Sequence, residues 1–599
     1  MIENYISAKT AGTLDGLFRE RVRLTPQMTA YKHYDRQQEC WRDTSWAEMG
    51  HMVSRWQAAL QSENLQKGDR VGLLLSNSRE WVAYEQAALG LGLVVVPFYV
   101  DDRPDNIAYI INDAGVKIML LENEKQQQQL IPLLEQLEPV QRFVVLNNKT
   151  GNLPVDDERI VFADSWLPES GEGLRERGGD PHQMATIVYT SGTTGRPKGV
   201  MLSHSNILFV ADAAINSVDV SGEHIFVSFL PLSHMLERTG GYVLPMMIAA
   251  TVAYARSIQQ LANDIETIKP TALISVPRIY ERIYERLNNQ LQKKSFIARG
   301  LFDLTTKIGW HRFEYQQKRK SWSPALLLWP VLYRLVARKL HECLGGRLQF
   351  AVTGGAALPP VVAKVFIGLG INLLQGYGLT ETSPVLAVNT PFKNNPTSVG
   401  MAPEGIELTI GEKDELLARG PGVMLGYWNN HQATSEMIDS EGWLHTGDKA
   451  CIEDDFVYIT GRIKDIIVMS NGEKIPPVDM ENAITLAPLF EQAVITGEGK
   501  AYLTALVVLN GEHWVTLARE LNLDPFDKNN LNNNKLQTVL LMNIRECLRD
   551  FPGYAKIRRV TPLLEQWTVE NDLLTPTLKV KRAKVITQFH DTIETMYAD

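Results

Sequence analysis

The chain is poor in features that mark several large classes of protein. It has four cysteines, Cys40, Cys343, Cys451 and Cys547, which are far apart and form no Cys-x-x-Cys pair. This spacing argues against a disulfide framework or a zinc site, and it favours a reducing compartment. The net charge of −9 gives no basic footprint for nucleic acid.

Long hydrophobic runs are also scarce. Two uncharged stretches, 86–100 and 240–255, are shorter than the roughly 18 to 20 apolar residues that a spanning helix needs, and both contain Gly and Pro. We expect them to be buried elements of a folded core. The N-terminus has no basic segment followed by an apolar one, so no signal peptide is predicted. We therefore expect a cytoplasmic protein, either soluble or peripheral on the inner face of a membrane.

The remaining composition is that of a large globular protein. With 599 residues, 44% of them hydrophobic, the chain can form more than one domain. Short apolar runs alternate with helical patterns at 81–89 and 125–137, which predicts α/β layers with mostly parallel sheets. The expected strands are 70–75, 93–97, 117–121, 143–146, 185–188, 272–276, 348–353 and 371–375.

The pattern of predicted strands changes towards the C-terminus. From about residue 410 the predicted strands become shorter and alternating, and after residue 465 they suggest a compact α+β module. Its expected elements are strands at 466–469, 493–495 and 503–509 and a helix at 477–486. We place the boundary near Arg462, which gives domains 1–461 and 462–599. Connected domains with a ligand between them are expected to move.

The most informative segment is 189–204, which reads Tyr-Thr-Ser-Gly-Thr-Thr-Gly-Arg-Pro-Lys-Gly-Val-Met-Leu-Ser-His. A Ser/Thr/Gly loop offers hydroxyls and backbone amides to an anionic oxygen cluster, and Lys198 adds a positive charge. It is not a Walker loop, because Lys198 precedes Gly199 and only two residues separate Gly192 from Gly195. The alternative is an ordinary surface turn.

Three further segments carry residues suited to the same ligand. In 373–382, Tyr377 offers an aromatic face, Thr380 a hydroxyl and Glu381 a hard oxygen ligand for magnesium. In 443–448 and 461–462, a carboxylate and an arginine can grip a ribose. The segment 574–582 is a basic tail. Each segment also has an alternative interpretation when it is considered alone. These are, in order, a strand-end turn, a structural turn and a solvated charge cluster.

The order and spacing of the four segments resemble those of the AMP-forming acyl-adenylate synthetase superfamily. The resemblance extends over nearly the whole chain, from about residue 14 to 584. It implies a large N-terminal domain of layered α/β subdomains with a distorted β-barrel-like part, followed by a small mobile α+β domain. It also implies ATP, Mg²⁺ and an acyl acceptor such as CoA as ligands.

The resemblance assigns roles residue by residue. The implied phosphate residues are Thr190, Ser191, Gly192, Thr193, Thr194, Gly195 and Lys198. Those for the adenine are Gly354, Gly355 and Ala356, with Tyr377 stacking on the purine, and Gln375, Gly376 and Gly378 are further implied nucleotide-binding residues. Those for the ribose are Asp448 and Arg462. Thr380 is expected to touch the α-phosphate and Glu381 to bind magnesium.

The small domain carries the implied catalytic lysine, Lys579. Most members of the superfamily have glycine before that lysine, whereas this chain has Leu578, as long-chain enzymes do, and this leaves Lys581 as a competing candidate. Lys464 lies at the implied hinge. After rotation, Gly472 and Lys474 are expected to face the thiol.

Two segments bear on the acyl group. The segment 229–238 (Phe-Leu-Pro-Leu-Ser-His-Met-Leu-Glu-Arg) resembles the long-chain fatty acid–CoA ligase branch, with His234 beside the acyl site, where it positions rather than transfers protons. The alternative is a packed core histidine. The long helical region 275–344 is largely missing from short-chain members. Within it, 325–340 is either an interfacial helix or a core or dimer-contact helix.

The sequence thus predicts a long-chain fatty acid–CoA ligase that uses ATP, Mg²⁺ and CoA. Two alternatives stay open: an acyl–acyl-carrier-protein synthetase and a non-catalytic acyl or nucleotide sensor. A homodimer and peripheral membrane contact also remain open.

Overall fold

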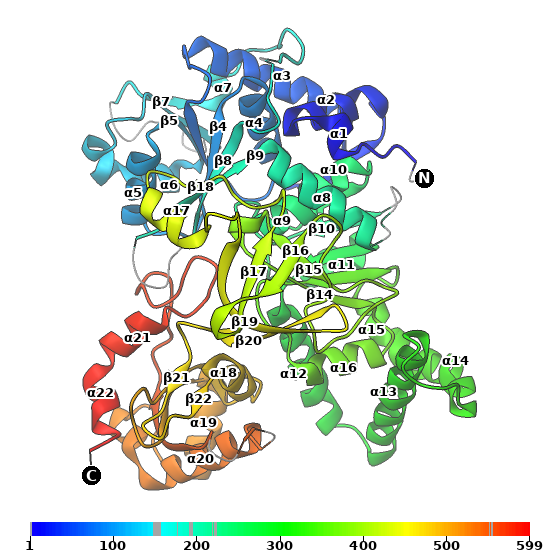
Figure 1. Ribbon diagram of the computed structural model, residues 1–599, viewed down its shortest axis with the longest axis vertical. Helices are drawn as coiled ribbons and strands as arrows, with labels where there is room; N and C mark the ends of the chain where they lie inside the picture. Colours follow the sequence, from blue (N-terminus) through cyan, green and yellow to red (C-terminus); the bar gives the residue numbers. More distant parts are fainter. Residues whose placement is uncertain are drawn as a thin grey trace.

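The computed structural model divides into a large N-terminal part and a small C-terminal part (Figure 1). The structure describes residues 3–147, 157–176, 178–190, 196–218, 220, 224–549, 551–552 and 555–598. The C-terminal part, drawn in orange and red, lies below the sheets of the N-terminal part and beside the helices α12 to α16 (Figure 1). Two large sheets and one smaller sheet build the N-terminal part.

The first large sheet has eight strands in the order β18-β9-β8-β4-β3-β5-β6-β7. The strands from β8 to β7 are parallel, whereas β9 and β18 join one edge in antiparallel fashion. All four residues of β4 are buried, as expected for an interior parallel strand with both faces covered. The strands are β3 (Arg70–Leu74), β4 (Val94–Pro97), β5 (Val116–Asn123), β6 (Arg142–Asn147), β7 (Ile160–Phe162), β8 (Met184–Thr190), β9 (Lys198–Ser203) and β18 (Gly426–Tyr427).

The second large sheet also has eight strands, in the order β15-β14-β13-β12-β10-β11-β1-β2. Its central strands are parallel, and the two edge strands, β2 and β15, run antiparallel to their neighbours. The strands are β1 (Thr29–Asp35), β2 (Cys40–Ser45), β10 (Ile225–Ser228), β11 (Thr251–Tyr254), β12 (Ala272–Ser275), β13 (Phe350–Thr353), β14 (Leu373–Gly378) and β15 (Val385–Val388).

An antiparallel four-stranded sheet completes the N-terminal part. Its strands are β16 (Glu407–Ile410), β17 (Glu415–Arg419), β19 (Leu444–Glu453) and β20 (Phe456–Arg462). Isolated bridges from Val388 to Met401 and from Gly400 to Val457 connect β15 to β20. These bridges join the smaller sheet to the edge of the second large sheet.

The helices of the N-terminal part lie around these sheets (Figure 1). They are α1 (Ala8–Ala11), α2 (Leu14–Leu24), α3 (Trp46–Ser62), α4 (Arg79–Gly90), α5 (Pro104–Ala114), α6 (Glu124–Leu130), α7 (Ala163–Trp166), α8 (His204–Val218), α9 (Met235–Glu237), α10 (Leu244–Met247), α11 (Leu261–Ile268), α12 (Pro277–Gln292), α13 (Phe296–Gln316), α14 (Trp329–Leu332), α15 (Arg338–Cys343), α16 (Pro360–Gly368) and α17 (His431–Met437).

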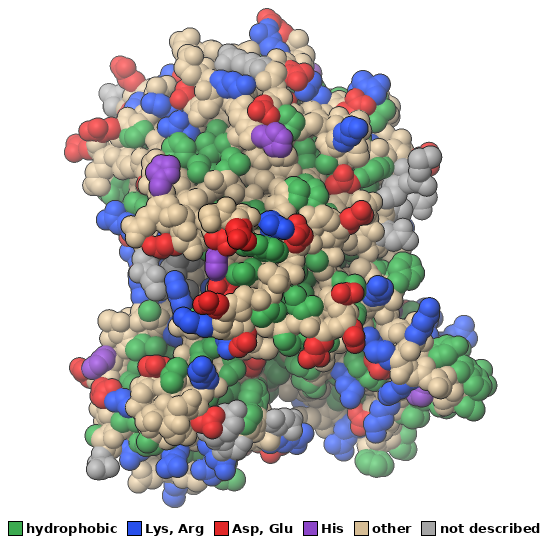
Figure 2. Space-filling model, viewed as in Figure 1, with side chains coloured by type: hydrophobic (Ala, Val, Ile, Leu, Met, Phe, Trp, Pro, Cys, Tyr) green, Lys and Arg blue, Asp and Glu red, His purple; other side chains and the backbone are tan. Residues whose placement is uncertain are grey.

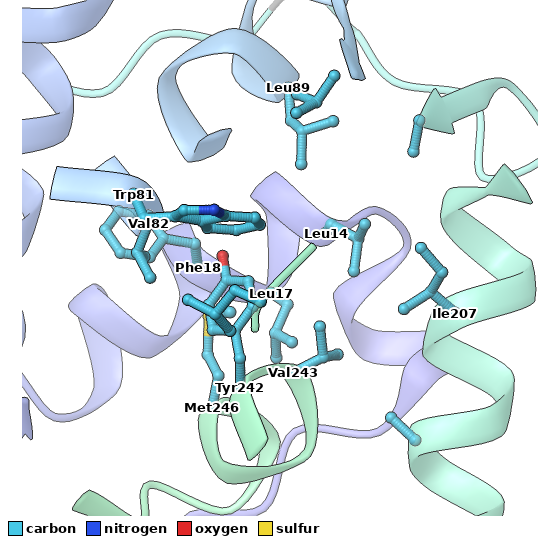
Figure 3. Packing of buried hydrophobic residues seen from close by; sticks show 14 of the residues in the cluster. Leu14, Leu17, Phe18, Trp81, Val82, Leu89, Ile207, Tyr242, Val243 and Met246 are labelled. Atoms are coloured by element: carbon cyan, nitrogen blue, oxygen red, sulfur yellow. The ribbon is translucent and has the colours of Figure 1, made fainter. Parts of the chain in front are cut away.

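A shared core joins several of these helices. Trp81 on α4 lies over Tyr242 with their rings 5.9 Å apart, and Leu17 and Phe18 of α2 pack beside them (Figure 3). Tyr242 belongs to the π-helical segment Arg238–Val243, which follows α9 directly. The segment that begins at His234 is therefore anchored by buried aromatic packing.

The C-terminal part is an α+β unit with its own core. All seven residues of its strand β24 are buried between helices. The strands are β21 (Ile467–Val468), β22 (Lys474–Ile475), β23 (Phe490–Thr496), β24 (Leu503–Leu509) and β25 (Ile557–Leu563). The helices are α18 (Pro477–Thr485), α19 (Gly511–Glu520), α20 (Asn534–Cys547), α21 (Arg582–Gln588) and α22 (His590–Thr595).

Most of the expected elements are present. The strands predicted at 93–97, 185–188 and 503–509 correspond to β4, β8 and β24. The helix expected at 125–137 is divided, because Pro132 supplies no amide hydrogen and the chain tightens into a 3-10 helix at Ile131–Gln136. The segment 325–340 is likewise not one regular helix: it passes through 3-10, α and π turns.

The two uncharged stretches noted in the sequence lie in the interior. Residues 86–100 span the end of α4 and β4, and residues 240–255 contain α10 and β11. Nearly all of their side chains are buried. Among the described residues, no helix has both the length and the apolar character required to cross a bilayer.

Candidate active site

The ends of β13 and β14 bring the predicted adenine residues together. Gly354 follows β13, and a Cβ atom on it would lie 3.3 Å from the carbonyl oxygen of Gly376 in β14. Gly355 has a φ of +81°, a conformation that glycine adopts without strain. A Cβ atom at Gly378 would lie 1.6 Å from the carbonyl oxygen of Pro384, so only glycine fits there. Ala356 and Gln375 flank this pair of strand ends.

A hydrogen-bonded cluster joins the next three predicted residues. Tyr377 donates its hydroxyl proton to Oδ2 of Asp448 at 2.6 Å, and Arg462 Nε donates to Oδ1 at 3.0 Å. Asp448 on β19 stands directly opposite Arg462 on β20, so the strand register itself creates the pair. The carboxylate is buried, and each of its oxygens keeps a second lone pair for a ligand hydroxyl.

A second cluster connects Lys198 with Glu381. Lys198 Nζ lies 5.0 Å from the centre of the Tyr427 ring, and the Tyr427 hydroxyl donates to Oε1 of Glu381 at 2.8 Å. Thr380 and Glu381 begin a short 3-10 helix at Thr380–Thr382 that follows the Gly378 turn. Lysine, hydroxyl and carboxylate groups therefore occupy one region beside the strand ends.

Tyr427 was missed in the sequence. It follows Gly426 on β18, which pairs with β9, so the strand that carries Lys198 also positions Tyr427. A glycine followed by two aromatic residues, Tyr427 and Trp428, was the available signal. It has no fixed spacing relative to the other segments, and only the sheet brings it to the site.

The predicted phosphate loop is described only at its two ends. Thr190 ends β8 and Lys198 begins β9, and the two residues are paired opposite one another in the sheet. Ser191, Gly192, Thr193, Thr194 and Gly195 lie outside the described residues. Of the described residues, Lys198 at the start of β9 lies beside Tyr427, which hydrogen-bonds Glu381.

Lys579 reaches this site from the C-terminal part of the chain. A tight hairpin holds it: Lys579 donates its backbone N–H to Oγ1 of Thr575 at 3.0 Å and accepts from the N–H of Thr575 at 2.8 Å. Burial lowers the pKa of Lys579, the nearby charge of Arg462 lowers it further, and Asp448 opposes the shift. The residue is also exposed to solvent, so its side chain lies among these charged groups in a space that water enters.

His234 lies within reach of the charge of Lys579. Its Nδ1 accepts the backbone N–H of Leu236 at 3.2 Å and caps the start of α9. Burial lowers the pKa of His234 to about 4, and the charge of Lys579 contributes. The imidazole is therefore neutral near pH 7, and its proton resides on Nε2. The Nε2–H group can donate a hydrogen bond. A neutral imidazole is too weak an acid to release that proton near pH 7, so His234 does not serve as a general acid.

The backbone explains the unusual residue before the lysine. Leu578 has a φ of +60°, in the left-handed region where glycine is the usual residue, and its side chain is exposed. Leucine in this conformation costs roughly 1–2 kcal/mol. The backbone at Leu578 therefore has the turn conformation that glycine usually adopts, although the residue is leucine.

The competing lysine has a different position. Lys581 Nζ donates to Oδ1 of Asp572 at 2.5 Å, and Arg103, the N-cap residue of α5, approaches Oδ2 of the same carboxylate at 3.0 Å. This ion cluster lies between α5 and the C-terminal unit, in a cleft of about 1130 Å³. Of the two lysines, it is Lys579 whose charge lowers the pKa of His234 and whose own pKa is lowered by the charge of Arg462.

Three predicted residues are not brought to this cluster. Lys464 is exposed in the connection between β20 and β21. Gly472 turns the chain between β21 and β22 with a φ of +85°, and Lys474 begins β22 with its side chain exposed. This β21–β22 turn is fixed from within the C-terminal unit, where Ser470 donates its N–H to the carbonyl of Lys500.

Two supporting features were also missed in the sequence. Asn77, in the turn before α4, donates to the carbonyl of Leu230 at 2.6 Å and accepts from the N–H of Leu232 at 2.9 Å. It thereby holds the segment that leads to His234. Further along, Arg238 forms a fully buried ion pair with Glu85 on α4. Single polar residues of this kind have no spacing pattern that the sequence could reveal.

The described residues suit a magnesium ion that is carried by a ligand. Glu381 supplies a carboxylate and Thr380 a hydroxyl, both of which are hard oxygen donors. No group of three or more His, Cys, Asp and Glu side chains gathers in the described part of the chain to form a complete metal site. Magnesium commonly keeps several waters and shares phosphate oxygens with one or two carboxylates, so this donor set fits.

Comparison with protein families accounts for this arrangement. The sequence model described as AMP-binding enzyme matches residues 18–428, and the one described as AMP-binding enzyme C-terminal domain matches residues 464–599. The chain belongs to the AMP-binding enzyme family. The predicted resemblance to AMP-forming acyl-adenylate synthetases is confirmed.

Several relatives in this family are similar over most of their length. The long-chain-fatty-acid–CoA ligase FadD15 of Mycobacterium bovis is 30% identical over 590 residues, which cover 93% of this chain and 92% of the relative. The peroxisomal long chain acyl-CoA synthetase 6 of Arabidopsis thaliana is 29% identical and covers 93% and 81%. The human long-chain-fatty-acid–CoA ligase ACSBG1 is 27% identical and covers 94% and 82%.

Solved structures of other AMP-binding enzymes have the same fold. The adenylation domain of a carboxylate reductase from Mycobacterium chelonae has a TM-score of 0.77 at 19% identity, with 100% of this chain and 94% of that chain covered. The anthranilate CoA ligase AuaEII, solved with anthranoyl-AMP, has a TM-score of 0.73 at 18% identity and covers 99% of each chain. The predicted fold class is confirmed.

Proposed function

We propose that this AMP-binding enzyme is a long-chain fatty acid–CoA ligase that converts ATP, a fatty acid and CoA into acyl-CoA, AMP and pyrophosphate. The observation that carries the proposal is the position of Lys579. This lysine of the C-terminal part lies close enough to Asp448 and Arg462 of the N-terminal part for their charges to shift its pKa, and its own charge lowers the pKa of His234. The relatives that are similar over most of the chain are named as long-chain acyl-CoA ligases.

The first step joins two anions, so catalysis depends on position and positive charge. The carboxylate oxygen of the fatty acid attacks the α-phosphorus of ATP, the bond to the β-phosphoryl oxygen breaks, and pyrophosphate leaves with that electron pair. Lys198 and Lys579 are placed to stabilise the charge on the phosphates. Anionic substrates favour the ammonium form of Lys579 and oppose the lowering of its pKa.

The remaining site residues hold the nucleotide. We assign the ribose hydroxyls to Asp448 and Arg462 and the adenine to the strand-end turns around Gly354 and Gly376. Magnesium, when bound with ATP through Glu381, neutralises phosphate charge. Tyr377 has a double role in this proposal, because its ring lines the adenine side while its hydroxyl fixes Asp448.

In the second step, the thiol sulfur of CoA attacks the acyl carbon of acyl-AMP. The bond between that carbon and the phosphate oxygen breaks, AMP leaves, and the thiol proton passes to solvent. The boundary predicted between residues 461 and 462 falls inside β20, so we assign the hinge between the two domains to the connection that follows this strand, at Lys464. Rotation there withdraws Lys579 and brings Gly472 and Lys474 to the thiol.

The acyl group is assigned to the side of the site where His234 lies. The neutral imidazole can donate from Nε2 to a carbonyl oxygen without adding charge. We also propose that the enzyme acts in the cytoplasm and takes its fatty acid at a membrane surface, because long-chain acids partition into bilayers.

Two measurements on the purified protein test the proposal. Palmitate-dependent exchange between ATP and radiolabelled pyrophosphate measures the first step. Absence of exchange would contradict the proposal and favour a non-catalytic sensor. Transfer of radiolabelled palmitate to free CoA or to acyl carrier protein reports the second. Faster transfer to the carrier protein would overturn CoA as the acceptor.

A further inference from the structure

The helical region beyond β12 has a charge opposite to that of the rest of the chain. Residues 293–347 contain twelve Lys and Arg and three Asp and Glu, which gives a net charge of +9. The whole chain carries −9, so the remaining residues carry −18. A local excess of this size in an acidic protein creates a positive field over one region of the surface.

Large apolar side chains are exposed in the same region. Leu327 is 70% exposed, Val331 58% and Leu335 55%, and Leu328 beside them is 50% exposed. Figure 2 shows hydrophobic and basic side chains together at the lower right, where Figure 1 draws α13 and α14. Single exposed apolar residues are ordinary, but four within nine positions form a continuous patch.

Buried residues of the same segment fix its orientation, so that the patch is directed towards solvent. Leu332, Ala337 and Leu340 are buried in the core that includes Phe302 of α13. Trp329 is clamped from the other side, because the guanidinium of Arg312 lies 5.5 Å from its ring. The opposite side of the segment, with Leu328, Val331 and Leu335 at spacings of three and four, therefore faces solvent.

A groove borders the apolar patch and adds basic groups. It has a volume of about 1440 Å³ and is lined by Val331 and Leu335 together with Arg334, Arg338 and Arg347. Arg338 pairs with Glu342 at 2.8 Å. The groove thus presents apolar side chains and cations next to one another, as an amphiphile with an anionic head requires.

We propose that this patch, Leu327, Leu328, Val331 and Leu335 with the flanking arginines, docks the protein on the surface of anionic phospholipids. The apolar side chains enter the interface, and the positive field of residues 293–347 is attracted to lipid headgroups. The biological role of this docking rests on the proposed function, because a membrane supplies the long-chain fatty acid that the enzyme would use. The docking itself does not require catalysis.

The test is flotation of the full-length protein with lipid vesicles, without fatty acid or nucleotide. We expect at least about tenfold stronger binding to vesicles with 30% phosphatidylglycerol than to pure phosphatidylcholine vesicles, and weaker binding in 0.5 M salt. The triple variant L327S/L328S/V331S should lose most of the binding. The variant R334E/R338E should lose the preference for phosphatidylglycerol.

Two controls separate docking from folding and from catalysis. F526S/M542S removes two exposed apolar side chains of the C-terminal unit, 85% and 62% exposed, and should bind vesicles as the wild type does. All variants should keep palmitate-dependent pyrophosphate exchange when the acid is supplied in detergent. This assay fails if the proposed function is wrong, whereas the flotation fails only if the docking is wrong.

Two results would overturn the inference. One is equal vesicle binding by the wild type and L327S/L328S/V331S. The other is a wild-type dimer in solution that this variant dissociates, together with no wild-type binding to either vesicle. The patch would then be a contact between two copies of the chain.

Discussion

The two parts of the molecule contribute to the site in different ways. The N-terminal part fixes its residues on paired strands: Asp448 and Arg462 are opposite one another in the β19–β20 ladder, and Tyr377 reaches them from β14. The C-terminal part contributes Lys579 on a short hairpin at 574–580, outside its large core. The geometry of the Tyr377–Asp448–Arg462 cluster is therefore fixed within the N-terminal part, whereas the position of Lys579 depends on the position of the whole C-terminal unit.

One contact between the two parts is polar and partly exposed, and it stands beside the packing of Leu486 against the N-terminal core. Arg103 approaches Asp572 across the cleft, and Lys581 and Lys584 pair with the same carboxylate. Exposed ion pairs of this kind contribute little, typically 0–1 kcal/mol. An interface held in this way can separate readily, which a two-step reaction with two arrangements of the domains requires.

Lys579→Ala should have the largest effect. We expect acyl-AMP formation to fall by roughly 10²–10³-fold, because a charge that stabilises the transition state is removed. Transfer to CoA from supplied acyl-AMP should be largely retained. Pyrophosphate exchange and a thiolation assay measure the two steps, and Lys581→Ala is the matched control. Equal loss of both steps would contradict a role limited to adenylation.

Glu381→Ala should have the next largest effect, on magnesium dependence. Loss of the carboxylate removes a hard oxygen ligand, so the Mg²⁺ concentration for half-maximal exchange should rise by about tenfold or more. Tyr427→Phe leaves Glu381 in place but removes its 2.8 Å hydrogen bond, and should cause a smaller rise. An unchanged Mg²⁺ titration at full turnover in the alanine variant would exclude the ligand role.

Arg103→Ala should weaken the contact between the two parts of the molecule only slightly. It removes the ion pair to Asp572 across the cleft. We expect a loss of about two- to fivefold in acyl-AMP formation and none in thiolation, because only the first step needs this arrangement. Single-turnover measurements of each step provide the comparison. A greater loss in thiolation than in adenylation would contradict the assignment of this arrangement.

Glu237→Gln should have the smallest effect, on the pH dependence of stability. Burial raises the pKa of Glu237 to about 8, against about 4.5 when unfolded. Between these values the folded protein holds a proton that the unfolded chain releases, so stability falls as pH rises from 4.5 to 8. The glutamine variant lacks this contribution, and its Tm should fall less between pH 6 and 8, by a few degrees at most. An identical pH profile of Tm would contradict the raised pKa.

The sequence could predict those parts of the site that lie in contiguous motifs. The glycines at 354–355 and 376–378 indicate tight strand-end turns, and their close backbone contacts leave room for no larger residue at Gly378. The alternation of apolar runs predicts the parallel sheets, because interior strands must be apolar on both faces. Tyr427 and Asn77 could not be found in this way, since each acts through partners more than 40 residues distant.

What the sequence determined by itself is local: the strands, the turns that need glycine, and the types of side chain available for phosphate, ribose and magnesium. Only the tertiary structure decided which of Lys579 and Lys581 faces His234. The two lysines are two residues apart on the same hairpin, and docking of that hairpin between the domains sends one to the site and pairs the other with Asp572. Such a choice depends on long-range packing and charge, which spacing along the chain does not encode.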